Sequence, residues 1–255
     1  MTTVEQVARR ARRDLERLSR PAARFDAKRY FRGETGLGFY NVGSAQVRGL
    51  ARAIAADQRG VWTVKEAQRF ADLLMPDRYL EVKGLGVELL ARYRREFTRA
   101  MLPTWKGWLA RGYSANWATT DAVCGLLIGP LLVAHPPLIA QMPAWARHKR
   151  LWVRRASAVS LIYPVRKGLS LTIAYRIARL LRHDQADLIQ KAVGWLLREA
   201  GKVDAQRLET YLLANGPAIP RTTVRYAIER FEEGRRKHLL TATLPGRSRR
   251  PANRW

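Results

Sequence analysis

Apolar residues recur at helical spacing in almost every segment of this 255-residue chain, and sustained alternation of apolar and polar residues is hard to find. Turn-forming residues separate these segments, as in RGYSAN (111–116) and NGPAIP (215–220). We therefore expect an all-α fold. Allowing about two to four residues at each end, the expected helices are 3–20, 24–32, 44–57, 63–75, 78–97, 99–111, 117–134, 137–149, 151–166, 169–183, 185–201, 205–215 and 221–240.

The expected helices alternate with short connectors, so that a helix pair recurs about every 35 to 40 residues. This period is typical of α-solenoids built from HEAT or armadillo repeats, although the repeats here are degenerate in sequence. One helix of each pair in such a stack lines a concave surface. We expect an α-solenoid of HEAT-like repeats that forms a single domain over residues 1–242.

The chain carries 47 Lys and Arg residues against 21 Asp and Glu residues, a formal net charge of +26. Such an excess favours a polyanionic partner, since neutralising phosphates releases counterions. The basic residues are spread over many of the expected helices, as in RYRREF (92–97) and RIARLLR (176–182). This spread predicts a concave basic surface that holds duplex DNA; the alternative is that many of these residues only solvate outer helix faces.

The last residues, 243–255, form a basic tail. From Pro245 onward the tail has four arginines, two prolines and no acidic residue, so it cannot build a packed core. We expect it to be disordered and to lie outside the folded domain.

Several classes of site and location are not expected. The four histidines show no ligand spacing and Cys124 has no Cys or His nearby in sequence, so no metal is predicted. The glycines of 33–38 match no phosphate-binding pattern, so no nucleotide cofactor is predicted. The longest apolar run, 125–134, is short and interrupted by Pro130, which argues against a membrane. A single cysteine and an N-terminus without an apolar signal segment fit the cytoplasm.

The segment NWATTDAVCG (116–125) places Trp117 and Asp121 four positions apart, on one face of an expected helix. An Asp near a helix N-terminus commonly stabilises the positive end of the helix dipole, and a Trp is commonly part of a core. Alternatively, the indole and the carboxylate act together on one ligand.

The segment LIQKAVGWLLREAGK (188–202) places Lys191, Trp195 and Arg198 on one helical face. Two cations that flank an indole suit a sugar-phosphate backbone, because the cations hold phosphates while the indole packs on a ring. Arg154 and Arg155, about one repeat upstream, add two more cations.

WATTD, WVRRASA and above all IQKAVGWLLRE resemble the AlkD-like bacterial DNA glycosylases, HEAT-repeat enzymes that excise alkylated purines. The resemblance covers roughly residues 28 to 235. It implies three catalytic residues, Trp117, Asp121 and Trp195. It also implies DNA contacts by Arg155, Arg198 and the N-terminal Tyr30.

The resemblance implies a monomeric, monofunctional glycosylase of the bacterial cytoplasm that needs no cofactor. Its substrate would be duplex DNA with cationic N3- or N7-alkylated purines, including bulky adducts, which are excised without a base-flipping pocket. Two other readings stay open: a non-catalytic HEAT-repeat protein that binds distorted or branched DNA, and a scaffold whose arginines bind an acidic protein. The physiological adduct, a simple methyl group or a bulky natural product met in self-resistance, also stays open.

Overall fold

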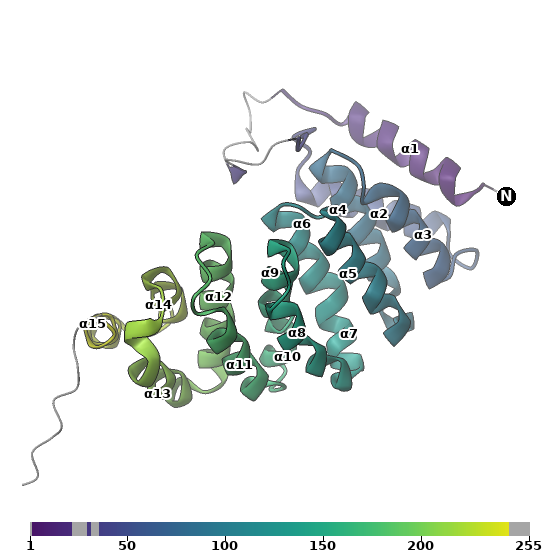
Figure 1. Ribbon diagram of the computed structural model, residues 1–255. Helices are drawn as coiled ribbons and strands as arrows, with labels where there is room; N and C mark the ends of the chain where they lie inside the picture. The colour runs from purple at the N-terminus through teal and green to yellow at the C-terminus, as the bar shows by residue number, and fades with distance from the viewer. Residues whose placement is uncertain (1, 22–29, 32–35, 245–255) are drawn as a thin grey trace, which may run out of the picture. The chain divides into compact units, whose positions relative to one another are not determined.

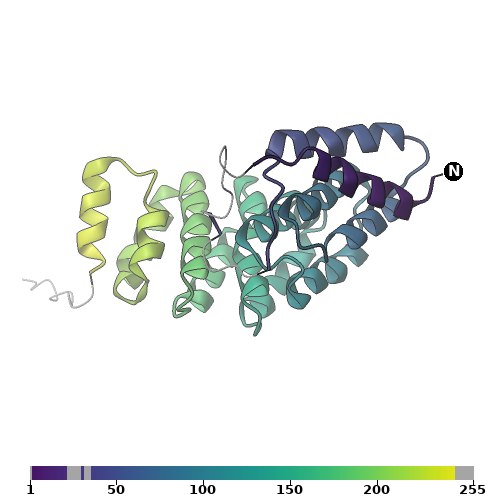
Figure 2. The ribbon, with the colours of Figure 1, turned by 90° about the horizontal axis from the view of Figure 1, so that it is seen from above.

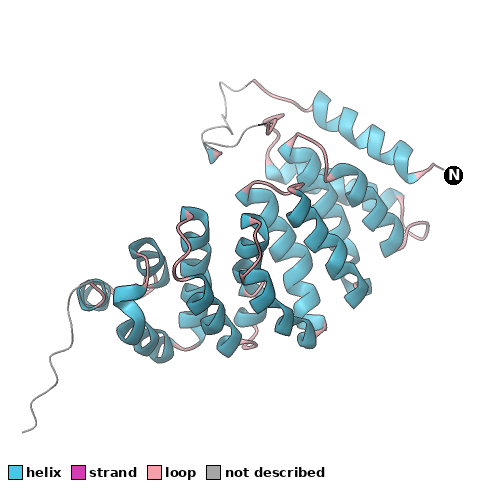
Figure 3. Ribbon diagram, in the orientation of Figure 1, coloured by secondary structure: helices cyan, strands magenta, loops and turns pink. Residues whose placement is uncertain are grey.

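The computed structural model describes residues 2–21, 30–31 and 36–244, and these residues are helical apart from turns and loops (Figures 1 and 3). Within these ranges, β pairing is limited to one isolated bridge between Gly38 and Tyr79. The expected all-α class is confirmed. The chain divides into two compact units, Met1–His135 and Pro136–Trp255, so the expected single domain over 1–242 stays a prediction.

Unit 1 is the N-terminal unit. Its elements in chain order are α1 (Val4–Arg17), α2 (Ser44–Asp57), α3 (Val64–Leu74), α4 (Leu80–Leu90), the 3-10 segments η2 (Ala91–Glu96) and η3 (Arg99–Met101), α5 (Leu102–Arg111), α6 (Trp117–Ala122), the π-helical segment η4 (Val123–Ile128) and α7 (Gly129–Ala134).

Unit 2 follows. Its elements are the 3-10 segment η5 (Pro136–Gln141), α8 (Met142–Ala146), α9 (Leu151–Val159), α10 (Ile162–Arg166), α11 (Leu171–Leu181), α12 (Asp187–Val203), α13 (Ala205–Asn215), the 3-10 segment η6 (Gly216–Ala218), α14 (Arg221–Ala227) and α15 (Glu233–Ala242).

Helix α4 is the central helix of unit 1, and it packs against α2, α3, α6 and η4. Gly86 permits the close approach of α3, because a Cβ atom there would lie 3.3 Å from the Cα of Ala71. The buried Lys83 donates hydrogen bonds of 2.8 Å to the carbonyl oxygens of Met75 and Tyr113. These bonds join α4 to the ends of α3 and α5.

Helix α12 has the same role in unit 2, where it packs against α9, α10, α11, α13 and α14. Figure 2 shows the helices that follow α12 in sequence also following it in space. Gly194 lets α14 lie against α12, since a Cβ atom there would be 2.9 Å from the carbonyl oxygen of Thr223. The Thr223 hydroxyl donates to the carbonyl oxygen of Gln190 over 3.0 Å. Helix α14 therefore packs against the face of α12 that carries Gln190 and Gly194.

The observed helices mostly follow the expected ones, but several are divided. The helices expected at 99–111 and 137–149 each begin as a 3-10 segment, η3 and η5, before α5 and α8. The helix expected at 78–97 ends at Leu90 and continues as the tighter η2, and that expected at 151–166 is divided near Ser160. The helix expected at 221–240 is two helices, because the Glu232 carboxylate caps α15 by accepting from the amides of Gly234 and Arg235 at 2.9 and 2.6 Å. The expected helix 24–32 and the expected tail lie largely outside the described residues.

Helices α6, η4 and α7 form one continuous helical run over Trp117–Ala134. Pro130 has no N–H and its ring would collide with the preceding turn of an α-helix. The wider π-helical turns before it relieve this, as in the bond from the Gly129 amide to the Cys124 carbonyl. By length and apolar composition alone this run could cross a membrane, but half of it is buried within the protein, and a buried core helix has the same length and composition.

Candidate active site and DNA-contacting residues

Trp117 and Asp121 lie one turn apart on the short helix α6. The turn before α6 needs Gly112, whose φ of 80° is in the left-handed region. Asn116 then caps the helix, with its side-chain oxygen accepting from the Thr119 amide over 2.7 Å. Thr120 donates to the carbonyl oxygen of Ser114 over 2.6 Å. The backbone under Trp117 and Asp121 is thus fixed by local hydrogen bonds.

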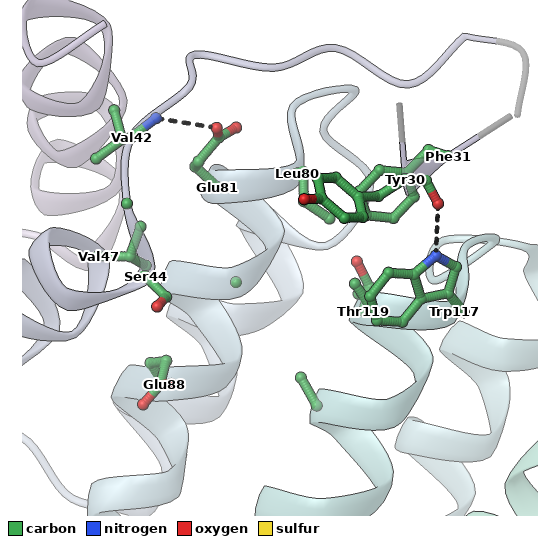
Figure 4. Close-up of a pocket in the computed structure, with 14 residues that line it drawn as sticks. Tyr30, Phe31, Val42, Ser44, Val47, Leu80, Glu81, Glu88, Trp117 and Thr119 are labelled. Atoms are coloured by element: carbon green, nitrogen blue, oxygen red, sulfur yellow. Dashed lines mark hydrogen bonds between the residues drawn. The ribbon is translucent and has the colours of Figure 1, made fainter. Parts of the chain in front are cut away.

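The Trp117 indole is held on two sides. Its Nε1–H donates a hydrogen bond of 3.0 Å to the carbonyl oxygen of Tyr30 (Figure 4). Its ring stacks on Phe31, with ring centroids 5.2 Å apart and an interplanar angle of 11°. The structure therefore brings Tyr30 and Trp117 together through the Tyr30 backbone, and leaves the Tyr30 side chain 62% exposed.

A cavity of about 660 Å³ opens beside Trp117 (Figure 4). Its walls come from the segment around Tyr30, from the start of α2, from one face of α4 and from α6. The lining residues are Tyr30, Phe31, Val42, Gly43, Ser44, Val47, Leu80, Glu81, Gly84, Glu88, Trp117, Ala118, Thr119 and Ala122. Asp121 lies on the neighbouring face of α6 and is half-buried.

Two carboxylates of this cavity were not predicted from the sequence. Glu81 is buried and accepts hydrogen bonds from the amides of Tyr40 and Val42 at 3.1 and 3.3 Å, so it anchors the segment that leads into α2. Burial raises the pKa of Glu88, while the charges of Arg48 and Arg92 lower it by a smaller amount. The available signal was two acidic side chains within a mostly apolar helix of a strongly basic chain.

In unit 2, Lys191, Trp195 and Arg198 follow one another along α12 as the spacing predicted. Lys191 forms an ion pair of 2.7 Å with Asp187, and the hydrogen bond in this pair raises the pKa of Lys191. Arg198 is ion-paired with Glu229 and lies 3.5 Å from a carboxylate oxygen of Glu199. Both cations therefore already have protein partners.

Trp195 is half-buried at the centre of α12. Its indole Nε1 is buried, and within the described ranges it has no hydrogen-bond partner. A buried donor without an acceptor costs about 1–3 kcal/mol, and such donors are rare in folded proteins. The position of Trp195 relative to Trp117 and Asp121, which belong to the other unit, stays a prediction.

The two arginines of α9 are more enclosed than a phosphate contact requires. Arg155 is 5% exposed and its guanidinium donates to the carbonyl oxygen of Leu188, at the start of α12. Arg154 donates to the Asp184 carboxylate over 2.7 Å and to the carbonyl oxygens of His148 and Lys149. Both guanidinium groups connect α9 to neighbouring segments, and their DNA contacts stay predictions.

Across the ranges that the structure describes, no cluster of three or more His, Cys, Asp or Glu side chains is placed to hold a metal ion. The chemistry that these residues offer is that of a carboxylate flanked by an indole, on a strongly basic protein.

Comparison with known proteins identifies the family. A search of curated proteins gave no match. Among solved structures, the fold resembles a protein from Enterococcus faecalis described as a predicted DNA alkylation repair enzyme, with 16% identity, a TM-score of 0.70, and coverage of 84% of this chain and 97% of that one. It also resembles smu.31 from Streptococcus mutans UA159, with 15% identity, a TM-score of 0.50, and coverage of 78% and 96%. These structural similarities concern the fold, whereas a sequence model of the DNA alkylation repair enzyme family matches residues 11–231. The chain therefore belongs to the DNA alkylation repair enzyme family.

Proposed function

We propose that this family member is a monofunctional DNA glycosylase that hydrolyses the N-glycosidic bond of cationic N3- or N7-alkylated purines in duplex DNA. The family gives the coarser role, repair of alkylated DNA. The observation that carries the finer proposal is the placement of Trp117 and Asp121 one turn apart on the capped helix α6. The net charge of +26 supports DNA as the partner.

The chemistry needs only one carboxylate. Glycoside hydrolysis ordinarily uses two carboxyl groups, one of which protonates the leaving group. A purine alkylated at N3 or N7 is already positively charged, so it leaves without a protonating acid. Asp121 then stabilises the positive charge that develops on the deoxyribose and positions or deprotonates the attacking water.

The two indoles complete the proposed site. Trp117 and Trp195 flank the deoxyribose and exclude bulk water, so the carboxylate acts at a lower effective dielectric. Their ring faces also attract the oxocarbenium-like sugar by cation–π interaction.

The proposed DNA contacts come from Arg155, Arg198, Lys191, Arg154 and Tyr30. The exposed Tyr30 ring lies on the same segment whose carbonyl holds Trp117, so a Tyr30 contact with DNA would reach the site directly.

The direct test is base release from three duplexes that carry labelled 7-methylguanine, 3-methyladenine or a bulky N3-alkyladenine, measured side by side. We expect release above the spontaneous rate from at least one duplex, with an intact strand until the abasic site is cleaved by alkali. Tight binding without release from any of the three would contradict the proposal and favour a non-catalytic protein that binds distorted DNA.

A further inference from the structure

The cavity beside Trp117 is larger than the proposed reaction needs. Excision of a methylated purine without base flipping places no group of the lesion in a pocket. A volume of about 660 Å³ falls within the range of sites that bind drug-sized molecules. We therefore expect this cavity to bind a ligand other than a methylated purine.

The walls of the cavity are mostly apolar and partly aromatic. Val47 of α2 and Leu80 of α4 contribute aliphatic surface, and the stacked rings of Phe31 and Trp117 contribute aromatic surface (Figure 4). Ala118 and Gly84 add no bulk, which keeps the space between the helices open. Aromatic ligands gain both apolar burial and ring–ring contact in such a space.

One polar group of the cavity is not used by the fold. Both oxygens of Glu81 accept backbone hydrogen bonds, whereas Glu88 makes no hydrogen bond or ion pair within the part of the chain that the structure describes. Arg48 and Arg92 act on Glu88 only as more distant charges. A half-buried carboxylate in an apolar cavity binds best to an N–H donor, and the bond is stronger if the donor is charged.

We propose that this cavity binds a planar polycyclic aromatic group that carries an N–H donor, with the donor directed to Glu88 and the rings between Val47, Leu80 and Trp117. Such a group can come from two sources, a free compound in solution or an adduct carried by a DNA base. The binding site itself does not depend on the proposed glycosylase activity.

Gly84 offers a selective way to fill the cavity. A Cβ atom at Gly84 would meet only Val47 Cγ1, at 3.9 Å, which is ordinary contact. Gly84→Leu therefore extends a side chain from the cavity wall with no close contact at its Cβ atom, and it replaces a helix glycine with a better helix former. Gly49→Leu is the matched control, because Gly49 lies on α2, meets no atom within 4 Å and does not line the cavity.

The first experiment measures binding of proflavine, a fluorescent three-ring aromatic diamine, to the full chain without DNA. We expect saturable 1:1 binding that Gly84→Leu weakens at least ~10-fold and Gly49→Leu leaves within about twofold, an energy difference of about 1.4 kcal/mol or more. Circular dichroism and thermal unfolding confirm that both variants fold. No saturable binding, or equal affinity in the two variants, would overturn the site.

The donor is tested with acridine, which has the same rings without the amino groups. Proflavine should bind more tightly than acridine to the wild type at pH 8, and Glu88→Gln should remove most of this preference while leaving acridine binding unchanged. A preference that persists in Glu88→Gln would overturn the assignment of Glu88.

A third experiment, on DNA, tests whether the aromatic group is a free compound or an adduct carried by a base. This experiment rests on the proposed glycosylase function. If the group is carried by a base, Gly84→Leu slows excision of a bulky polycyclic N3-adduct and spares 3-methyladenine. If the group is a free compound, Gly84→Leu leaves the excision rates of both lesions unchanged and removes only proflavine binding. A wild type that excises neither lesion yet binds proflavine would refute the glycosylase proposal and leave the site standing.

Discussion

The Trp117 indole Nε1–H donates a hydrogen bond of 3.0 Å to the backbone carbonyl oxygen of Tyr30, 87 residues earlier in the chain. The same ring stacks on Phe31. A backbone acceptor cannot be removed by changing the Tyr30 side chain, so this bond fixes Trp117 independently of any contact that Tyr30 makes with DNA.

Trp117→Phe removes the donor and keeps an aromatic face against Phe31. We expect the free energy of unfolding to fall by about 1 kcal/mol, the usual value of one hydrogen bond, and single-turnover excision to slow about tenfold. Trp117→Ala, which also removes the ring that excludes water, should slow excision by at least ~10². The check is single-turnover kinetics with urea unfolding of each variant; equal rates for Phe and Ala would show that the ring face has no role.

Arg198 is restrained by its ion pair with Glu229. Glu229→Gln releases the guanidinium, so we expect tighter non-specific duplex binding, by about three- to tenfold at low salt. Glu233→Gln is the matched control, since it removes one negative charge from the exposed ion pair of Glu233 with Lys237 in the same unit. Arg198→Ala should lower the slope of log K against log salt by about one unit. An unchanged slope would place Arg198 away from DNA.

Glu199 gives unit 2 an acid-sensitive contact. Burial alone would raise the pKa of Glu199, but hydrogen bonds of 2.9 Å from Arg166 and Lys202 outweigh burial and lower the pKa to about 2. The folded pKa is below the unfolded value of about 4.3, so the stabilisation is complete above about pH 5 and is lost as the pH falls towards 2. We expect the contacts of Glu199 to contribute about 2 kcal/mol to the free energy of unfolding, a value reduced by solvent screening around the half-exposed Arg166 and Lys202. Urea unfolding of wild type and Glu199→Gln across this range should converge at low pH; parallel curves would contradict the assignment.

Gly194 sets the distance between α12 and α14. Gly194→Ala places a methyl group 2.9 Å from the carbonyl oxygen of Thr223, so we expect a loss of about 1–3 kcal/mol from overpacking. Gly49→Ala, on an open helix face, should instead stabilise by up to about 1 kcal/mol. Chemical denaturation of both variants checks the pair. Equal effects would mean that α14 moves away at no cost.

The helices were predictable because each has an apolar stripe with turn residues at its ends. The division between α14 and α15 was missed since it depends on the Glu232 side chain turning back to cap α15, which periodicity does not record. The pairing of Trp117 with Asp121 was visible because it is local to one helix turn.

The cavity and the burial of Arg155 were not predictable from local residue spacing. Phe31 meets Trp117, and Glu88 shares a cavity with both, only after distant segments pack together. The resemblance implied a DNA contact by Arg155, but Arg155 is buried, and the carbonyl oxygen of Leu188 accepts a hydrogen bond from its guanidinium.

The most direct test of the proposed chemistry is single-turnover release of 3-methyladenine and 7-methylguanine by Asp121→Asn at saturating enzyme. This change removes the charge of the carboxylate and keeps its shape. Asp57→Asn, on the exposed end of α2, is the control for loss of one negative charge. We expect Asp121→Asn to bind the lesion duplex like the wild type and to release the base at least ~10² more slowly, with Asp57→Asn unchanged. Near-wild-type release by Asp121→Asn would contradict a catalytic role for Asp121.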